Sequence, residues 1–124
     1  MSYENLYHEE LLDHYKRPRN QGTLENSDFS AGVFNPLCGD QVLMQGTLKN
    51  GCIETCLFQA KGCVISLASA SLVTELVKGK KVEVVMNLSK QDILDVVKLQ
   101  LGPNRLRCAL IALEAVQNGL KESF

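Results

Sequence analysis

The 124-residue sequence lacks a net charge of either sign, since 13 Lys and Arg stand against 14 Asp and Glu. A protein that binds nucleic acid generally needs a basic surface, so this balance argues against nucleic acid as a partner. No hydrophobic run approaches the roughly 20 residues that a membrane-spanning helix needs. The opening residues, Met1 to Asn5, lack the basic start and apolar stretch of a secretory signal. We therefore expect a cytoplasmic protein with no membrane partner.

Internal repeats and low-complexity segments are also missing, and a composition of 45% hydrophobic and 22% charged residues is that of an ordinary globular protein. This length has room for one domain, so we expect residues 1–124 to form a single domain. Such a chain buries about two-thirds of its unfolded surface without help from a metal. A metal site would therefore serve chemistry, and a purely structural zinc domain is disfavoured.

The hydrophobic spacing predicts strands first and helices afterwards. Apolar residues at helical spacing predict a helix over residues 3–15, with Ser2 as its N-cap and ended by Pro18. Alternating residues on both sides of Asn50-Gly51 predict a hairpin with strands over 41–49 and 52–60. Residues 31–34 are a candidate third strand.

The second half of the chain is predicted to be helical. A helix is expected from Gly62 to Lys78, a short one opened by a capping box at Ser89 and Asp92, and a last one from about Leu106. Residues 81–87 are ambiguous between helix and strand. The order of elements favours an α+β fold, with a small antiparallel three-stranded sheet packed against several helices.

Five cysteines are many for a chain this short, and an odd number cannot all pair with one another. In a reducing compartment such cysteines are more often metal ligands or reactive thiols than disulfides. No C-x-x-C pair is present, so only folding could bring candidate ligands together, and buried structural cysteines remain an alternative. Cys52 and Cys56 alternate with apolar residues and are predicted to lie in the core or on the sheet. His8 and His14 are predicted to be surface residues.

The other three cysteines lie where the chain changes direction. Cys38 precedes the hairpin, Cys63 lies between the second strand and its helix, and Cys108 is expected in the first turn of the last helix. The partial positive charge of a helix N-terminus favours thiolates at Cys63 and Cys108. Arg105 and Arg107 act in the same direction at Cys108.

Asp40 follows Cys38 by two positions and would point to the same side of an extended segment. Three thiolates and this carboxylate make four protein ligands, the number that a tetrahedral zinc or a [2Fe–2S] cluster requires. An oxygen among three sulfurs binds soft metals less tightly. The carboxylate would be the ligand that is displaced most easily.

Three motifs in this order resemble the U-type iron–sulfur cluster assembly scaffolds, the IscU/NifU/SufU family. They are residues 35–40 (NPLCGD), 62–71 (GCVISLASAS) and 105–109 (RLRCA), and residues 13–20 (DHYKRPRN) match as well. The resemblance implies an α+β domain with Cys38, Asp40, Cys63 and Cys108 as ligands at one end. It further implies a scaffold, not an enzyme, which receives sulfur from a cysteine desulfurase, assembles a labile [2Fe–2S] cluster with iron and passes it to acceptor or carrier proteins.

Two departures separate the chain from IscU-type members. Arg107 stands where those members have a histidine, and residues 101–105 (LGPNR) replace a Leu-Pro-Pro-Val-Lys segment that a chaperone recognises. Handover through a dedicated Hsp70 chaperone is therefore in doubt.

Other features are similar to SufU-type members, although the insertion that those members usually carry before the last cysteine motif is missing. Arg105 and residues 15–20 carry this likeness. It implies an alternative function, in which zinc is held by the same four residues and the protein accepts sulfur as a persulfide from the desulfurase. Cys108 is the expected sulfur acceptor. The basic residues Lys16, Arg17 and Arg19 are either a solvated surface or, as the resemblance implies, a docking surface for the desulfurase.

Overall fold

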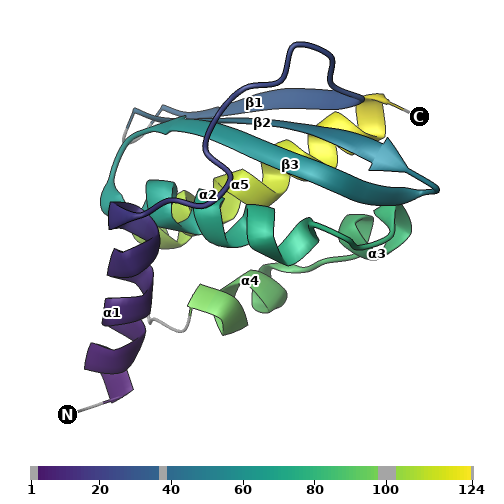
Figure 1. Ribbon diagram of the computed structural model, residues 1–124. Coiled ribbons are helices and arrows are strands. Elements are labelled where there is room, and N and C mark those ends of the chain that lie inside the picture. Colours follow the sequence, from purple (N-terminus) through teal and green to yellow (C-terminus); the bar gives the residue numbers. More distant parts are fainter. Residues whose placement is uncertain (1–2, 37–38, 98–102, 124) are drawn as a thin grey trace.

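The computed structural model describes residues 3–36, 39–97 and 103–123, and the side chains of residues 9–36, 39–97 and 106–123. The elements follow in the order α1 (Tyr3–Lys16), β1 (Phe29–Asn35), β2 (Asp40–Lys49), β3 (Cys52–Lys61), α2 (Val64–Val77), α3 (Val82–Met86), α4 (Lys90–Val97) and α5 (Pro103–Glu122). The predicted α+β class is confirmed (Figure 1). None of the described helices is long and apolar enough to cross a membrane.

The three strands form one antiparallel sheet in the order β1-β2-β3. The hairpin between β2 and β3 turns at Asn50 and Gly51, both with positive φ, as the Asn-Gly signal predicts. The candidate third strand is confirmed and is longer than predicted, because β1 spans Phe29–Asn35. Its last residue, Asn35, pairs with the first residue of β2, Asp40.

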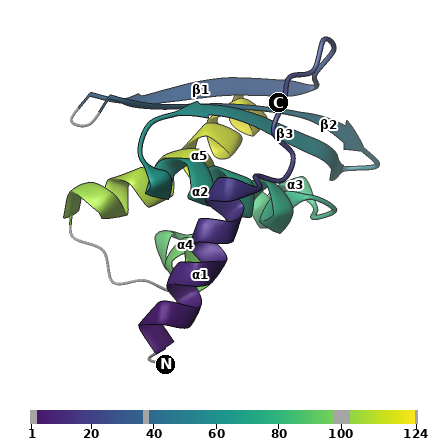
Figure 2. The same cartoon turned by 60° about the vertical axis from the view of Figure 1, so that its left-hand side comes forward.

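The helices cover one face of this sheet (Figures 1 and 2). The long α5 runs beneath β1 and β2, α2 lies beside it under β3, and α1 packs against α2 and extends away from the sheet. Alternation along β2 buries every second side chain, including Val42 and Met44, against these helices. The core therefore lies between the sheet and the pair α2 and α5.

The loop between α1 and β1 is fastened to the sheet by its backbone. The N–H of Gly22 donates to the carbonyl of Phe58, and the N–H of Phe58 donates to the carbonyl of Asn20, so the loop pairs with the edge of β3. At its other end the N–H of Asp28 donates to the carbonyl of Gly46. These bonds fix the loop that connects α1 to the sheet.

The last helix begins three residues earlier than predicted, because α5 starts at Pro103 and not near Leu106. Proline has no N–H to contribute and its φ suits the first helical position, so Pro103 opens the helix. Cys108 is therefore the sixth residue of α5 and lies in its second turn, not its first.

Two other helical predictions are resolved. The ambiguous residues 81–87 contain the short helix α3. The capping box before α4 is confirmed, since the N–H of Ser89 donates to Asp92 and the N–H of Asp92 donates to the Ser89 hydroxyl. Ser2, the expected N-cap of α1, lies outside the described residues.

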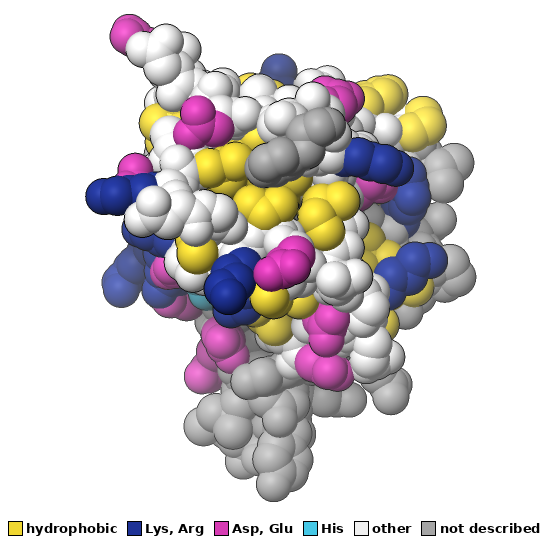
Figure 3. Space-filling model, turned by 90° about the vertical axis from the view of Figure 1, so that its right-hand side faces the viewer, with side chains coloured by type: hydrophobic (Ala, Val, Ile, Leu, Met, Phe, Trp, Pro, Cys, Tyr) yellow, Lys and Arg dark blue, Asp and Glu magenta, His cyan; other side chains and the backbone are white. Residues whose placement is uncertain are grey.

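The hairpin turn, α3 and the C-terminal part of α5 lie together at one end of the molecule (Figure 1). Seen from this end, hydrophobic side chains gather in the middle of the face and charged side chains surround them (Figure 3). Val84 of α3 is 45% exposed. Three of the residues predicted to bind metal, Asp40, Cys63 and Cys108, lie at the opposite end, where β2, α2 and α5 begin.

Candidate metal site

Asp40 is the first residue of β2, and the turn before it fixes its position. Gly39 has a φ of 76°, a left-handed conformation that favours glycine, and its N–H donates to the carbonyl of Asn35 at 2.8 Å. Asp40 is only 1% exposed. The carboxylate is therefore buried at the end of the sheet and faces the helices.

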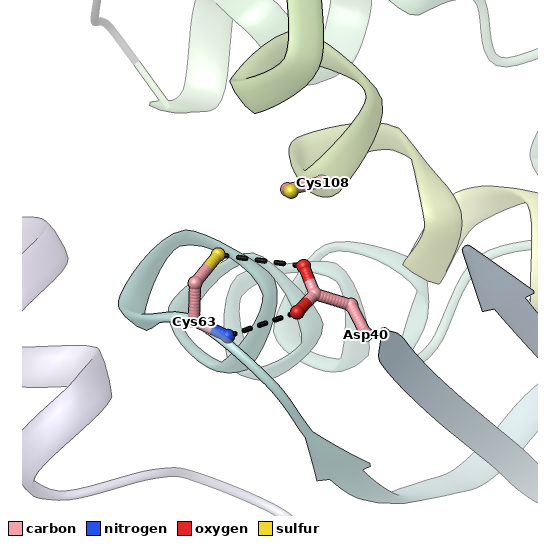
Figure 4. A group of neighbouring side chains, drawn as sticks. All are labelled: Asp40, Cys63 and Cys108. Atoms are coloured by element: carbon pink, nitrogen blue, oxygen red, sulfur yellow. Dashed lines mark hydrogen bonds between the residues drawn. The ribbon is translucent and has the colours of Figure 1, made fainter. Parts of the chain in front are cut away.

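Cys63 is the N-cap of α2 and has an extended backbone. Its N–H donates to Oδ1 of Asp40 at 3.1 Å, and its thiol donates to Oδ2 at 3.4 Å (Figure 4). Two groups of one residue therefore hold both oxygens of the carboxylate. The partial positive charge of this helix N-terminus favours the negative charge of the Asp40 carboxylate.

Gly62 makes this approach possible. Its φ is 151°, and a Cβ at this position would clash with the carboxylate oxygen and carbon of Asp40. Any other residue would therefore push the carboxylate away from the start of α2. The glycine beside Cys63 is a requirement of the site's packing.

Cys108 reaches the same place from α5. One donor atom each from Asp40, Cys63 and Cys108 lie within 4.8 Å of one another (Figure 4). Asp40 and Cys108 are buried, and Cys63 is half-buried. Two sulfurs and one carboxylate oxygen at such separations are a donor set that suits zinc or iron. Cys38, the fourth predicted ligand, lies outside the described residues.

Ser66 is part of this cluster, and the sequence analysis missed it. Its hydroxyl, which is fully buried, donates to Oδ2 of Asp40 at 2.5 Å and lies 3.6 Å from the sulfur of Cys63. The available signal was its spacing, because a residue three positions after Cys63 faces the same side of the helix.

Of the two arginines expected to favour a thiolate at Cys108, Arg107 is the one whose side chain the structure describes. Arg107 is exposed and forms an ion pair at 3.6 Å with Glu114, which lies two helical turns further along α5. The electrostatic effect of a helix N-terminus falls off within the first turn, and Cys108 is in the second. The side chain of Arg105 lies outside the described residues.

The remaining cysteines are confirmed as core or sheet residues. Cys56 is fully buried in β3, and burial raises the pKa of its thiol to about 12, so it stays protonated. Cys52 is half-buried at the start of β3, beside the hairpin turn. Neither belongs to the metal-ligand group.

The prediction that His14 is a surface residue is wrong. His14 is 9% exposed, and its Nδ1 lies 2.8 Å from the hydroxyl of Ser71 in α2. Burial disfavours the charged imidazole and lowers the pKa of His14. The partner is 57 positions away, so no local pattern could reveal the contact. The side chain of His8 lies outside the described residues.

The basic cluster has two kinds of member. Arg19 binds Asp13 at 2.5 Å, and this hydrogen bond holds the pKa of the Asp13 carboxyl below its usual value. Lys16 and Arg17 are exposed to solvent. The structure therefore gives Arg19 an intramolecular role, whereas Lys16 and Arg17 face solvent.

Comparison with known proteins agrees with this arrangement. The model of the family described as NifU-like N terminal domain matches residues 6–123. The chain is 34% identical to the zinc-dependent sulfurtransferase SufU of Bacillus subtilis, over 94% of this chain and 90% of that protein. It is 36% identical to the iron–sulfur cluster assembly scaffold protein IscU of Escherichia coli, over 94% and 92%. The N-terminal domain of a NifU-like protein from Brucella abortus shares the fold, with a TM-score of 0.77, 19% identity and coverage of 97% and 95%.

Proposed function

Because the chain belongs to the family of NifU-like N-terminal domains, we propose that it is a scaffold on which a [2Fe–2S] cluster is assembled and then passed to acceptor or carrier proteins. The observation that carries this proposal is the convergence of Asp40, Cys63 and Cys108 from three separate elements. Cys38 would supply the fourth ligand. The cluster is the protein's cargo, and the protein acts as a carrier and not as an enzyme.

The donor set suits a cargo that has to leave. Cys63 and Cys108 offer soft sulfurs, which hold iron firmly, whereas Asp40 offers a hard oxygen. A thiol of an acceptor protein would displace the oxygen more easily than a sulfur. We therefore assign Asp40 the role of the labile ligand.

Sulfur would arrive from a cysteine desulfurase that carries a persulfide. A thiolate of this chain attacks the outer sulfur, a new sulfur–sulfur bond forms on the chain, and the desulfurase cysteine leaves as a thiolate. Each transferred sulfur then needs two electrons from an external reductant to become sulfide. These thiols must be kept reduced, so we propose the cytoplasm as the place of action.

We propose Cys108 as the sulfur acceptor, and its burial sharpens the test. Cys108 is 4% exposed, whereas Cys63 is half-buried and more accessible to a partner. Mass spectrometry of peptides after incubation with desulfurase and cysteine would show which thiol gains a sulfur atom. Sulfur on Cys63 alone would overturn the assignment to Cys108.

Anaerobic reconstitution tests the scaffold function directly. Wild-type protein mixed with iron, sulfide and reductant should develop sulfur-to-iron charge-transfer absorption, and an Asp40→Cys variant, which replaces the labile oxygen with a fourth sulfur, should hold its cluster more firmly. The fold of each sample is checked by circular dichroism. A folded wild type without this absorption would exclude the scaffold function.

A second function, zinc-dependent sulfur transfer, is favoured by a separate observation. Three donor atoms within 4.8 Å of one another suit a single ion, and the SufU relative is named for its dependence on zinc. This function expects about one zinc in the purified protein and faster turnover of a desulfurase in its presence. Acceleration that survives removal of zinc would rule it out.

We propose that Lys16 and Arg17 dock the desulfurase. Both are exposed at the C-terminal end of α1, where Lys16 ends the helix and Arg17 begins the loop. Reversing both charges should weaken binding and reduce its dependence on salt. Arg19 stays unchanged in this experiment because it holds Asp13. Unaltered affinity would identify the pair as ordinary solvated residues.

A further inference from the structure

We infer that Ser66 is a positioning residue that aims the carboxylate of Asp40 at the two cysteine sulfurs and thereby sets the metal affinity of the site. This inference rests on the proposed function in one respect, namely that a metal is held by Asp40, Cys63 and Cys108. It adds a residue to which neither the ligand set nor the sequence motifs gave a role.

The contacts of Ser66 carry the argument. Its hydroxyl donates to Oδ2 of Asp40 at 2.5 Å, while the N–H of Cys63 holds Oδ1 at 3.1 Å. A carboxylate that is held at both oxygens cannot rotate about its Cβ–Cγ bond. Ser66 and Asp40 are 0% and 1% exposed, so water has little access to replace the hydroxyl. The carboxylate is therefore aligned before any metal arrives.

The position of Ser66 also couples two ligands. The hydroxyl lies 3.6 Å from the sulfur of Cys63, on the first turn of the helix that Cys63 caps. One side chain thus contacts both the oxygen ligand and a sulfur ligand. Hydrogen bonds from neighbouring residues to metal ligands orient them, and removal of such a bond typically lowers metal affinity by about 10- to 100-fold.

The same helix offers a matched control. Ser69 is also fully buried, one turn beyond Ser66, and its hydroxyl has no hydrogen-bond partner among the described residues. Replacing either serine by alanine removes one oxygen from the same helix. Only the change at Ser66 removes a contact with a proposed ligand.

The experiment measures zinc affinity by competition with a chromogenic chelator, in protein purified reduced. Ser66→Ala should bind zinc about 10- to 100-fold more weakly than wild type, and Ser69→Ala should bind it like wild type. Ser66→Thr, which keeps the hydroxyl, should restore most of the affinity. In an Asp40→Ala background, Ser66→Ala should cause a much smaller further loss, because the bond to Asp40 is already gone and only the 3.6 Å contact with Cys63 remains.

Each alternative result has a distinct meaning. Unchanged affinity in Ser66→Ala, or an equal loss with and without Asp40, would overturn the role of Ser66 while leaving the metal site intact. A folded wild type that binds no zinc and reconstitutes no cluster would overturn the proposed function itself. If the alanine variant does not fold, the zinc affinities of Ser66→Thr and Ser66→Val are compared instead, because these two side chains have nearly the same shape and differ in the hydroxyl.

Discussion

Helix α2 carries two buried polar clusters that differ in what they hold. On its first turn, Cys63 and Ser66 meet the carboxylate of Asp40. Two turns further on, Ser71 and Thr74 form the second cluster, which bonds His14 and the chain around Arg19 and Asn20 at 2.8–3.1 Å. Both clusters join segments that are distant in the sequence.

The two clusters differ in charge and in whether their polar groups satisfy one another by hydrogen bonds. The Ser71 cluster pairs hydroxyl, amide and imidazole groups with one another, and these hydrogen bonds hold α1 and the loop after it against α2. The Asp40 cluster contains a buried carboxylate and two thiols, all of which gain from a bound cation. A buried polar residue on one helix can therefore serve either cohesion or ligand binding, according to what faces it.

The largest expected effect that separates the clusters comes from removing a sulfur. Cys63→Ala or Cys108→Ala should weaken zinc binding by more than the roughly 100-fold that loss of a supporting hydrogen bond costs. Cys52→Ala is the control, because Cys52 lies near the hairpin and outside the ligand group. Chelator competition measures all three variants. A loss in Cys52→Ala as large as in the other two would contradict the assignment of the site.

Substitution of Gly62 should damage both packing and metal binding. A Cβ would strain the backbone and collide with Asp40, so Gly62→Ala should lower the free energy of unfolding by about 2 to 3 kcal/mol. Gly79→Ala, at the other end of α2, has a φ of 85° but an open surrounding, and should cost only about 1 kcal/mol. Urea unfolding gives both values. Equal costs would mean that the collision is relieved cheaply.

The Ser71 cluster should affect stability alone. Ser71→Ala leaves the imidazole of His14 and the N–H of Arg19 without their partner, and should lower the free energy of unfolding by about 1 to 3 kcal/mol. Zinc affinity should stay at the wild-type value, in contrast to Ser66→Ala. A matching loss of zinc affinity in both variants would show that the two clusters are not independent.

Acid should lower the free energy of unfolding through protonation of His14, which belongs to the same Ser71 cluster. Burial places the pKa of His14 in the folded chain below its ordinary 6.5. Between these two pKa values the unfolded chain binds the proton and the folded chain does not, so this contribution to stability is fully present above 6.5 and declines as the pH falls through the lowered pKa. Urea unfolding at about pH 7.5 and 5.5 should show the decline, and His14→Gln should reduce it. If the free energy of unfolding of His14→Gln depended on pH as that of wild type does, His14 would be excluded as the source of the decline.

The smallest effect is expected at Arg107. Its ion pair with Glu114 is solvent-exposed, so Arg107→Ala should change the free energy of unfolding by about 0.5 kcal/mol or less. Zinc affinity should hardly change, because the side chain is engaged away from Cys108. A clear fall in zinc affinity would instead show that the arginine supports the thiolate, as the sequence had led us to expect.

Local patterns predicted most of the fold. The Asn50-Gly51 turn fixes the hairpin through two left-handed residues, and the capping box of Ser89 and Asp92 marks the start of α4. The start of α5 was misjudged because Pro103 can either break or open a helix, and only the surrounding packing selects between these outcomes.

Contacts between distant segments were harder to predict. The motifs named Asp40, Cys63 and Cys108, and folding brings the three together. Ser66 was missed and His14 was wrongly predicted to be a surface residue because their partners, Asp40 and Ser71, are 26 and 57 positions away. Cys38 lies outside the described residues and stays a prediction from the sequence.

The early start of α5 places Cys108 near one tip of a helix that runs for 20 residues, a rod of about 30 Å. Just beyond the far end of this rod, the hydroxyl of Ser123 donates to the carbonyl of Asp28 at 2.8 Å, which ties the rod to the loop before β1. Because α5 is one continuous helix packed against β1, β2 and α2, the packing of its whole length sets the position of Cys108 in the metal site.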